Sequence, residues 1–240
     1  MKKMLSRIFH SIFPDSGIYV FVSKVLNRFQ REGFYTSYSE YAEDLILRDH
    51  LSNIKRDFYV DVGCNRPVRG NNTFRLYLQG WRGINIDGNE KLIQKFKKLR
   101  SKDLNLTAIV SNEKKEVTFF ISDTDRVSTI SRSQKEENIK RWNYTREVKM
   151  VSKTLEEILD EHLPANQQID FLNIDVEGHD YEVVQSLNFN KYRPTIICIE
   201  AHDFAIEKFN ENLIATYLIS IDYKIIAATY PNVFFKDKCN

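Results

Sequence analysis

The sequence predicts a doubly wound α/β fold, in which helices cover both faces of a mostly parallel sheet. Short apolar segments, several of which end in an acid, alternate with amphipathic segments along most of the chain. RGINID (82–87) has the pattern of a buried strand, and the helical segment that follows it, 88–100, has one apolar face formed by Leu92, Ile93, Phe96 and Leu99. Because a parallel crossover normally requires a helix, this alternation favours a parallel sheet.

The remaining elements extend the alternation to the end of the chain. Apolar and β-branched runs predict strands at 58–63, 104–111, 115–122, 146–152, 169–175 and 194–200. Helical periodicity predicts helices at 39–51, 72–78, 153–163, 179–187 and 206–219. The last two strands, 223–229 and 232–236, are joined only through Tyr230 and Pro231, so a C-terminal antiparallel hairpin is expected.

Three regions divide the chain. We expect a helical arm at 1–38, one α/β domain at 39–240, and a polar insertion or lid at 122–150 within that domain. Residues 1–30 combine Lys2, Lys3 and Arg7 with apolar side chains. We expect this segment to pack on the domain, and the alternative is an amphipathic helix that contacts a membrane or a partner.

The composition indicates a soluble globular protein, with 42% hydrophobic and 28% charged residues. The 35 Lys and Arg nearly balance the 33 Asp and Glu, which disfavours nucleic-acid binding. Three distant cysteines suggest neither a disulfide framework nor a zinc site, and no apolar run approaches the roughly 20 residues that span a membrane. We therefore expect a cytoplasmic protein, with the inner face of the membrane as a candidate location and a homo-oligomer as a candidate assembly.

Acidic residues recur where the predicted parallel strands end. Asp61, Asp87, Asp175 and Glu200 each close or nearly close a predicted strand. Ligands of open α/β sheets bind in the crevice outside the carboxyl ends of the strands. The pattern therefore predicts a ligand site that gathers these four carboxylates.

The turn after the first strand favours an adenosyl ligand without a pyrophosphate. DVGCN (61–65) lacks the GxGxxG spacing that lets a dinucleotide pyrophosphate approach a helix. Asp61 before a single tight glycine turn suits a ligand with an ammonium and a sulfonium group. Asp87 stands where a carboxylate accepts both ribose hydroxyls.

These residues resemble the FkbM-type methyltransferases, a branch of the class I S-adenosylmethionine-dependent enzymes. In the family's order over residues 58–200, the resemblance is carried by FYVDVGCN, NNTFRLYLQGWRGINIDGN, AIVSN, KTLEEIL, FLNIDVEGHDYEVVQSL and RPTIICIE. The segment 39–51 is similar to the family's S-Q-x-G-E-D pattern, with Ser39, Glu43 and Asp44 retained but Glu40 and Ala42 departing from it. The resemblance implies a Rossmann-like fold with a seven-stranded sheet and S-adenosylmethionine as the methyl donor.

The resemblance also implies a set of cofactor-binding residues. Asp61, Gly63, Asn65 and Asp175 are expected near the methionine part of the cofactor, Asp87 at its ribose, and Ser111 near its adenine. Asn72 and Thr73, at a helix start, are candidate donors to the cofactor carboxylate, with a plain helix cap as the alternative. Two residues depart from the family's usual pattern, namely Cys64 in place of alanine and Gly88 in place of proline.

Methyl transfer from a sulfonium requires alignment and exclusion of water, and a hydroxyl acceptor also requires a base. Candidate bases are Asp175, Glu177, His179, Glu200 and His202. We expect the catalytic set to be His202 as the base, Glu200 to orient it, and Asp175, because an imidazole titrates near neutral pH. In an alternative arrangement, Asp175, Glu177 and Glu200 hold Mg²⁺.

Oxygen is the expected methyl acceptor, because NIDVEG replaces the N-P-P-Y or D-P-P-Y element of enzymes that methylate base amino groups. The insertion offers groups that stack on a sugar and pair with a phosphate: Arg126, Ser128, Arg132, Lys140, Arg141, Trp142, Tyr144 and Arg146. We expect a sugar hydroxyl of a bacterial surface glycan or glycolipid precursor. Alternatives are a polyketide, lipid, protein or other small-molecule acceptor, a nucleotide or dinucleotide enzyme of the same fold, and a catalytically silent binding subunit.

Overall fold

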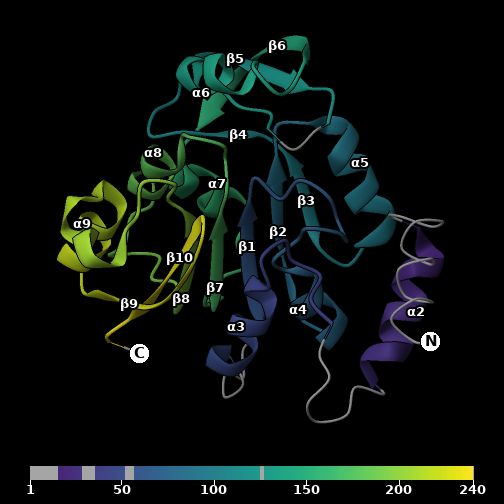
Figure 1. Ribbon diagram of the computed structural model, residues 1–240. Helices are drawn as coiled ribbons and strands as arrows, with labels where there is room; N and C mark the ends of the chain where they lie inside the picture. Colours follow the sequence, from purple (N-terminus) through teal and green to yellow (C-terminus); the bar gives the residue numbers. More distant parts are fainter. Residues whose placement is uncertain (1–15, 29–35, 52–56, 125–126, 240) are drawn as a thin grey trace.

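A computed structural model of the chain describes residues 16–28, 36–51, 57–124 and 127–239. Its central sheet has seven strands in the order β3-β2-β1-β7-β8-β10-β9 (Figure 1). The first five strands in this order, β3, β2, β1, β7 and β8, pair in parallel, whereas β10 is antiparallel to both β8 and β9. The predicted Rossmann-like, mostly parallel sheet with a C-terminal antiparallel hairpin is confirmed. The strands of this sheet are β1 (Phe58–Val62), β2 (Arg82–Asp87), β3 (Leu104–Thr107), β7 (Phe171–Ile174), β8 (Ile196–Glu200), β9 (Tyr223–Thr229) and β10 (Asn232–Asp237).

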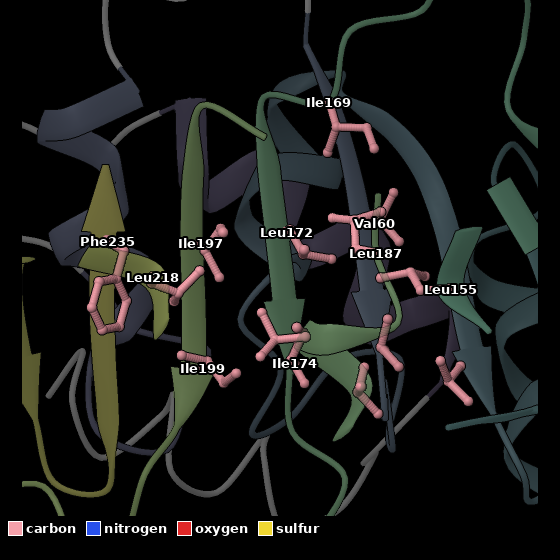
Figure 2. Close-up of a cluster of buried hydrophobic side chains, with 14 of the residues drawn as sticks. Val60, Leu155, Ile169, Leu172, Ile174, Leu187, Ile197, Ile199, Leu218 and Phe235 are labelled. Carbon is pink, nitrogen blue, oxygen red and sulfur yellow. The ribbon is translucent and has the colours of Figure 1, made fainter. Parts of the chain in front are cut away.

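Helices cover both faces of the central sheet, because its strands are apolar on both sides. Side chains of α7, α8 and α9 pack on one face, and side chains of α3 and α4 pack on the other. Figure 2 shows the first of these clusters, in which Val60, Leu172, Ile197 and Phe235 come from four strands. The helices are α2 (Gly17–Arg28), α3 (Glu43–Leu51), α4 (Phe74–Gln79), α5 (Glu90–Leu99), α6 (Arg132–Asn138), α7 (Leu155–His162), α8 (Asp180–Gln185), η1 (Ile206–Glu211) and α9 (Leu213–Ser220).

A second, three-stranded sheet forms from the end of the predicted strand 104–111 and from the two strands predicted on either side of the insertion. The predicted strand 104–111 divides at Ala108 into β3, in the central sheet, and β4 (Ile109–Val110), which pairs with β6. The other strands of the small sheet are β5 (Glu116–Ser122) and β6 (Tyr144–Lys153), which are antiparallel to each other. The predicted insertion 122–150 therefore contains α6 and the facing ends of β5 and β6.

The predicted helix 206–219 is wrong as one continuous element. The chain forms the 3-10 helix η1, leaves helical geometry at Asn212, and starts again as α9. The Asn212 side chain accepts a hydrogen bond from the backbone N–H of Ala215 at 2.8 Å, so it caps the second helix. Asn212 therefore ends η1 and begins α9, although the surrounding sequence has the apolar periodicity of one continuous helix.

The arm expected at 1–38 is described only from residue 16 onward, with a gap at 29–35. Tyr19 and Val20 of α2 pack against Phe74 and Tyr77, whereas Ile18, Phe21 and Val25 are exposed. None of the helices in the described ranges is long and apolar enough to cross a membrane. A contact of residues 1–30 with a membrane stays a prediction.

A buried arginine joins the central sheet to the loop that follows β1. Arg100, directly after α5, is fully buried and forms an ion pair with Asp103 at 3.1 Å. Its guanidinium also donates to the Tyr59 hydroxyl, to Asn71 Oδ1 at 3.0 Å and to Thr73 Oγ1 at 2.8 Å. The ion pair and these hydrogen bonds satisfy a charge that would otherwise be costly to bury.

Replacing Arg100 by leucine should strongly destabilise the fold, because the Asp103 carboxylate would then stay buried without its cation. Breaking such a pair costs about 3–5 kcal/mol. The matched control is Lys149→Ala, which removes an exposed pair with Glu116 and should cost less than about 1 kcal/mol. Urea unfolding measures both free energies, and equal losses would contradict the assigned role of Arg100.

Candidate functional site

Two adjoining cavities lie at the carboxyl ends of the parallel strands. The small cavity, of about 60 Å³, is lined by residues at the ends of β1 and β2 and by residues of β4 and β5, including Asp87, Gly88, Ile109 and Phe119. The large cavity, of about 490 Å³, extends from the β1 loop to β8, β10 and α6. Gly63, Asn65, Asp175 and Glu177 line both cavities. These four residues form the boundary between the two cavities.

The turn after β1 brings the backbone close to β2 and β7. Gly63 has a φ of +77°, and a Cβ added to it would lie 1.7 Å from the carbonyl oxygen of Asp175. The backbone N–H groups of Gly63 and Cys64 both donate to the carbonyl of Ile86, at 2.9 and 3.1 Å. Only glycine fits this position, because it supplies both the positive φ and the missing side chain.

Asp61 is fully buried and acts as the centre of a hydrogen-bond network. Its carboxylate accepts from the Thr73 hydroxyl at 2.7 Å, from Asn173 Nδ2 at 2.9 Å and from Asn71 Nδ2 at 3.3 Å. Burial raises the pKa of this carboxyl, and the nearby Arg100 opposes that rise. Asp61 lines the large cavity, but much of its hydrogen-bonding capacity is used to hold the surrounding loop.

The structure places the two candidate donors at the helix start differently. Asn72 lines the large cavity, and its amide donates to Asn173 Oδ1 at 3.0 Å. Thr73 is fully buried and lines neither cavity, its hydroxyl donates to Asp61, and its backbone N–H donates to Asn71 Oδ1 at 3.1 Å. Thr73 therefore supports the loop from behind.

The small cavity combines a carboxylate with apolar walls. Asp87 accepts the backbone N–H of Asn65 at 3.0 Å and that of Asn89 at 2.7 Å, and these bonds orient its carboxylate. A Cβ at Gly88 would lie 2.3 Å from Ile109 Cδ1 and 2.9 Å from Phe119 Cε1, so these two side chains occupy the space beside the glycine. A larger residue at position 88 would therefore displace Ile109 or Phe119.

Ser111 lies behind the small cavity rather than on its surface. Its hydroxyl is 2.9 Å from Nε2 of His179, and His179 lines the cavity. Burial lowers the pKa of His179. The neutral His179 imidazole, held by its hydrogen bond to Ser111, is therefore a fixed polar group in the wall of the small cavity.

The floor of the large cavity contains two buried oxygen atoms without a hydrogen-bond partner among the described residues. These are Oε2 of Glu200 and Oδ1 of Asn232, whose side chains belong to residues that are 7% and 6% exposed. The two residues are direct partners in the antiparallel pairing of β8 with β10. Asn232 Nδ2 donates to Glu43 Oε1 at 2.8 Å, which fixes the amide with its oxygen as the remaining acceptor. Buried unpaired acceptors are costly, so these two oxygens call for hydrogen-bond donors from water or from a ligand.

His202 forms part of the rim of the large cavity. Its Nε2 is 3.2 Å from Glu200 Oε1, and its Nδ1 is 3.4 Å from the Tyr230 hydroxyl. The bond to Glu200 raises the pKa of His202 to about 9. At neutral pH this imidazole is therefore protonated, which disagrees with the expectation of a histidine that titrates near pH 7.

Carboxyl groups near the loop after β7 repel one another. Burial and then Glu200 raise the pKa of Asp175 well above its ordinary value, and they raise those of Glu177 to about 8 and Asp180 to about 7. Asp180 also accepts the backbone N–H groups of Val176 and Gly178, at 2.9 and 3.1 Å, so it shapes this loop.

The geometry does not support the metal site expected at Asp175, Glu177 and Glu200. Within the ranges that the structure describes, no three His, Cys, Asp or Glu side chains are arranged to hold an ion. The three residues do line one cavity, but they belong to two different strand ends. Sharing a cavity wall is a weaker condition than converging on one point at ligand distance.

The residues of the insertion are divided between several places. Arg141 and Trp142 line the large cavity and Ser128 lines the small one, whereas Arg132 lies at a separate hollow with Phe120 and Lys135. The Tyr144 hydroxyl donates to the carbonyl of Val127 at 2.7 Å. Lys140 and Arg146 are exposed, and Arg126 lies outside the described residues.

Several residues at the site were not expected from the sequence. Asn71, Asn173 and Asn232 take part in the polar floor, and Tyr41 and Tyr230 stand at the rim of the large cavity. Asn173 is the first residue of the NIDVEG element and the register partner of Asp61 in the parallel pairing of β1 with β7. Aligning these two predicted strands in parallel would have identified Asn173 as a neighbour of Asp61. Predicting that Asn232 belongs to the site would have required the register in which β10 pairs with β8, because this register places Asn232 beside Glu200.

Comparison with known proteins identifies one matching family. A family model described as the methyltransferase FkbM domain matches residues 61–225, which is more than half of the chain. No curated protein and no solved structure matches the chain. The matched range contains all four strand-end acids and His202, but it ends before Tyr230 and Asn232. The resemblance predicted from the sequence is confirmed.

Gly63→Ala should lower the free energy of unfolding much more than Gly80→Ala, although both glycines have a positive φ. Gly80 has a φ of +108°, but no atom lies within 4 Å of an added Cβ, so Gly80→Ala should cost only about 1–2 kcal/mol of backbone strain. Gly63→Ala adds a collision with the Asp175 carbonyl and should cost about 3 kcal/mol or more. Urea unfolding of both variants is the measurement, and equal losses would show that the turn can open without penalty.

NMR titration of the imidazole rings should find a pKa of about 9 for His202, above its ordinary value of 6.5. In Glu200→Gln this pKa should fall, because the charged partner is removed. Protonated His202 stabilises the fold at pH values below about 6.5, and this contribution is lost as the pH rises through about 9. His179 serves as the internal control, because burial shifts its pKa downward. A His202 pKa at the ordinary value would refute the assigned ion pair.

Proposed function

Since this chain belongs to the FkbM methyltransferase family, we propose that it is an S-adenosylmethionine-dependent O-methyltransferase whose acceptor is a sugar hydroxyl. The observation that carries the acceptor assignment is the pair of buried, unpartnered oxygens of Glu200 and Asn232 in the floor of the large cavity. Both are hydrogen-bond acceptors, and neighbouring hydroxyl groups of a sugar are hydrogen-bond donors. A glycan or glycolipid precursor is the substrate class that we expect.

The residues of the small cavity fit the nucleoside part of the cofactor. Ile109 and Phe119 provide apolar contact for a planar base, and Asp87 lies at the edge of the cavity. The backbone N–H groups of Asn65 and Asn89 orient the Asp87 carboxylate, which we assign as the acceptor for the ribose hydroxyls. His179, held by Ser111, supplies a polar group on the same wall.

Residues of the large cavity next to the β1 turn fit the positively charged part of the cofactor. Gly63 and Asn65 bring the backbone close, while Asp61 and Asp175 supply carboxyl groups. A cation beside Asp175 would offset the repulsion from neighbouring carboxylates that raises its pKa. The donor set therefore matches a sulfonium and an ammonium better than it matches a pyrophosphate.

Aromatic side chains at the rim of the large cavity support a sugar acceptor. Tyr41, Trp142 and Tyr230 are 51%, 37% and 69% exposed, and all three line this cavity. Exposed aromatic rings are costly on a free surface but provide flat apolar contacts for a ligand with a polar edge. A sugar ring could therefore stack on the aromatic side chains at the rim while its hydroxyl groups donate hydrogen bonds to the acceptors at the floor.

S-adenosylmethionine, when bound, supplies a methyl group that an acceptor oxygen displaces in line: the O–C bond forms as the C–S bond breaks, and the bonding pair remains on sulfur. We assign to Glu200 Oε2 the acceptance of the hydroxyl proton. His202, protonated at neutral pH, bonds to the other oxygen of Glu200 and orients the carboxylate. In this assignment, Glu200 takes the role first expected of His202.

Calorimetry and methyl transfer from a labelled cofactor to sugar acceptors test the proposal. Asp87→Ala should weaken binding of S-adenosylmethionine by about tenfold or more, because a charged hydrogen-bond acceptor is lost. Glu200→Gln should lower kcat by about 10²-fold or more while leaving cofactor affinity nearly unchanged. Glu207→Gln, an exposed glutamate in η1, is the matched control.

Three outcomes would contradict the assignment. Binding of NAD but not of S-adenosylmethionine would indicate a dinucleotide enzyme. Cofactor binding without transfer to any acceptor would indicate a silent binding subunit. Full activity of Glu200→Gln would remove Glu200 from the chemistry.

A further inference from the structure

The rim of the large cavity carries arginines without carboxylate partners. Arg69 in the loop after β1 and Arg141 after α6 both line the cavity, and neither forms an ion pair with any described residue. Elsewhere in the described chain, Arg75, Arg100 and Arg193 are each paired with an aspartate. The two rim arginines therefore differ from the structural arginines in having their guanidinium groups directed to solvent or ligand.

Carboxyl groups line the large cavity at every depth, whereas Arg69 and Arg141 lie at its rim. The carboxyl groups of Glu43, Asp61 and Glu200 are buried in the floor, whereas Arg69 and Arg141 are exposed. Glu40 and Glu137 also reach the rim, so the rim attracts an anion only at the arginines themselves. Guanidinium groups match the paired oxygens of phosphate and carboxylate groups, and neighbouring Trp142 can contact an attached ring.

We propose that the acceptor is an anionic sugar derivative, whose phosphate or carboxylate is bound by Arg141 and Arg69 while its hydroxyl groups reach Glu200 and Asn232. This inference rests on the proposed sugar O-methyltransferase function and narrows its substrate class. Glycosyl phosphates, nucleotide-linked sugars and uronic acids share the required chemistry. A free neutral sugar would leave both guanidinium groups unpaired.

The test uses the full chain saturated with S-adenosylhomocysteine, and three probes with a common ring: a free hexose, its 1-phosphate and its uronic acid. Binding is followed by the fluorescence of Trp142, since Trp81, the other tryptophan, is buried. At least one anionic probe should bind tenfold or more tightly than the free hexose, and added salt should reduce this preference. The stronger of the two anionic probes identifies phosphate or carboxylate as the recognised group.

Arg141→Gln should reduce the preference for the anionic probe by about tenfold, and Arg69→Gln should also reduce it. Arg132→Gln is the matched control, because this arginine begins the helix α6 that precedes Arg141 but lies at a different hollow. The fluorescence change should be lost in Trp142→Phe. Calorimetry of the same titrations gives affinities that do not depend on the tryptophan.

Equal affinity for the free hexose and both anionic probes would overturn the inference, as would equal effects of Arg141→Gln and Arg132→Gln. Failure of the proposed function has a different signature, namely absence of cofactor binding or of methyl transfer to any hydroxyl. An enzyme that methylates neutral sugars and is indifferent to Arg141 would refute only the anionic acceptor. Methyl transfer to the preferred anionic probe, with kcat/KM lowered in Arg141→Gln, would support both.

Discussion

The guanidinium of Arg100 connects the stability of the fold to the geometry of the site. It binds Asp103 and Tyr59 on the sheet side and Asn71 and Thr73 on the loop side. Thr73 in turn donates its hydroxyl to Asp61, so a chain of hydrogen bonds runs from a buried arginine to the floor of the large cavity. Because each member is buried and satisfied by the next, moving the loop after β1 would leave charges unpaired.

This network explains how the Asp61 carboxylate can be buried at the wall of the large cavity. Desolvation raises its pKa, while Arg100 and the donors Thr73, Asn173 and Asn71 oppose that rise. The carboxyl groups that lack such compensation, Asp175 and Glu177, have their pKa values raised by neighbouring acids as well as by burial. The site thus contains one neutralised structural carboxylate and a group of mutually repelling ones, and the second group favours a cationic ligand.

Much of the fold could be predicted from the sequence, because buried parallel strands and amphipathic helices have clear patterns. The break of 104–111 at Ala108 and the cap at Asn212 were missed, since both depend on which partner strand or helix the chain meets next. Arg100 was also missed. At the end of a lysine-rich helix it has the pattern of a surface cation, and its burial is made possible only by partners distant in the sequence, such as Tyr59 and Asn71. Local sequence gives no sign of such compensation.

The two halves of the site differ in how their residues are distributed along the chain. The cofactor half is built largely from the turns after neighbouring strands, around Gly63 and Asp87, which is why a short motif could indicate it. The acceptor half combines Tyr41, Trp142 and Asn232, from three distant segments that meet only in the folded protein. Its rim residues are exposed and lie outside the Arg100 network, so they can change without a large cost in stability. Under the proposed function, a fold organised in this way can keep one methyl-donor site while its acceptor specificity varies through residues at the rim.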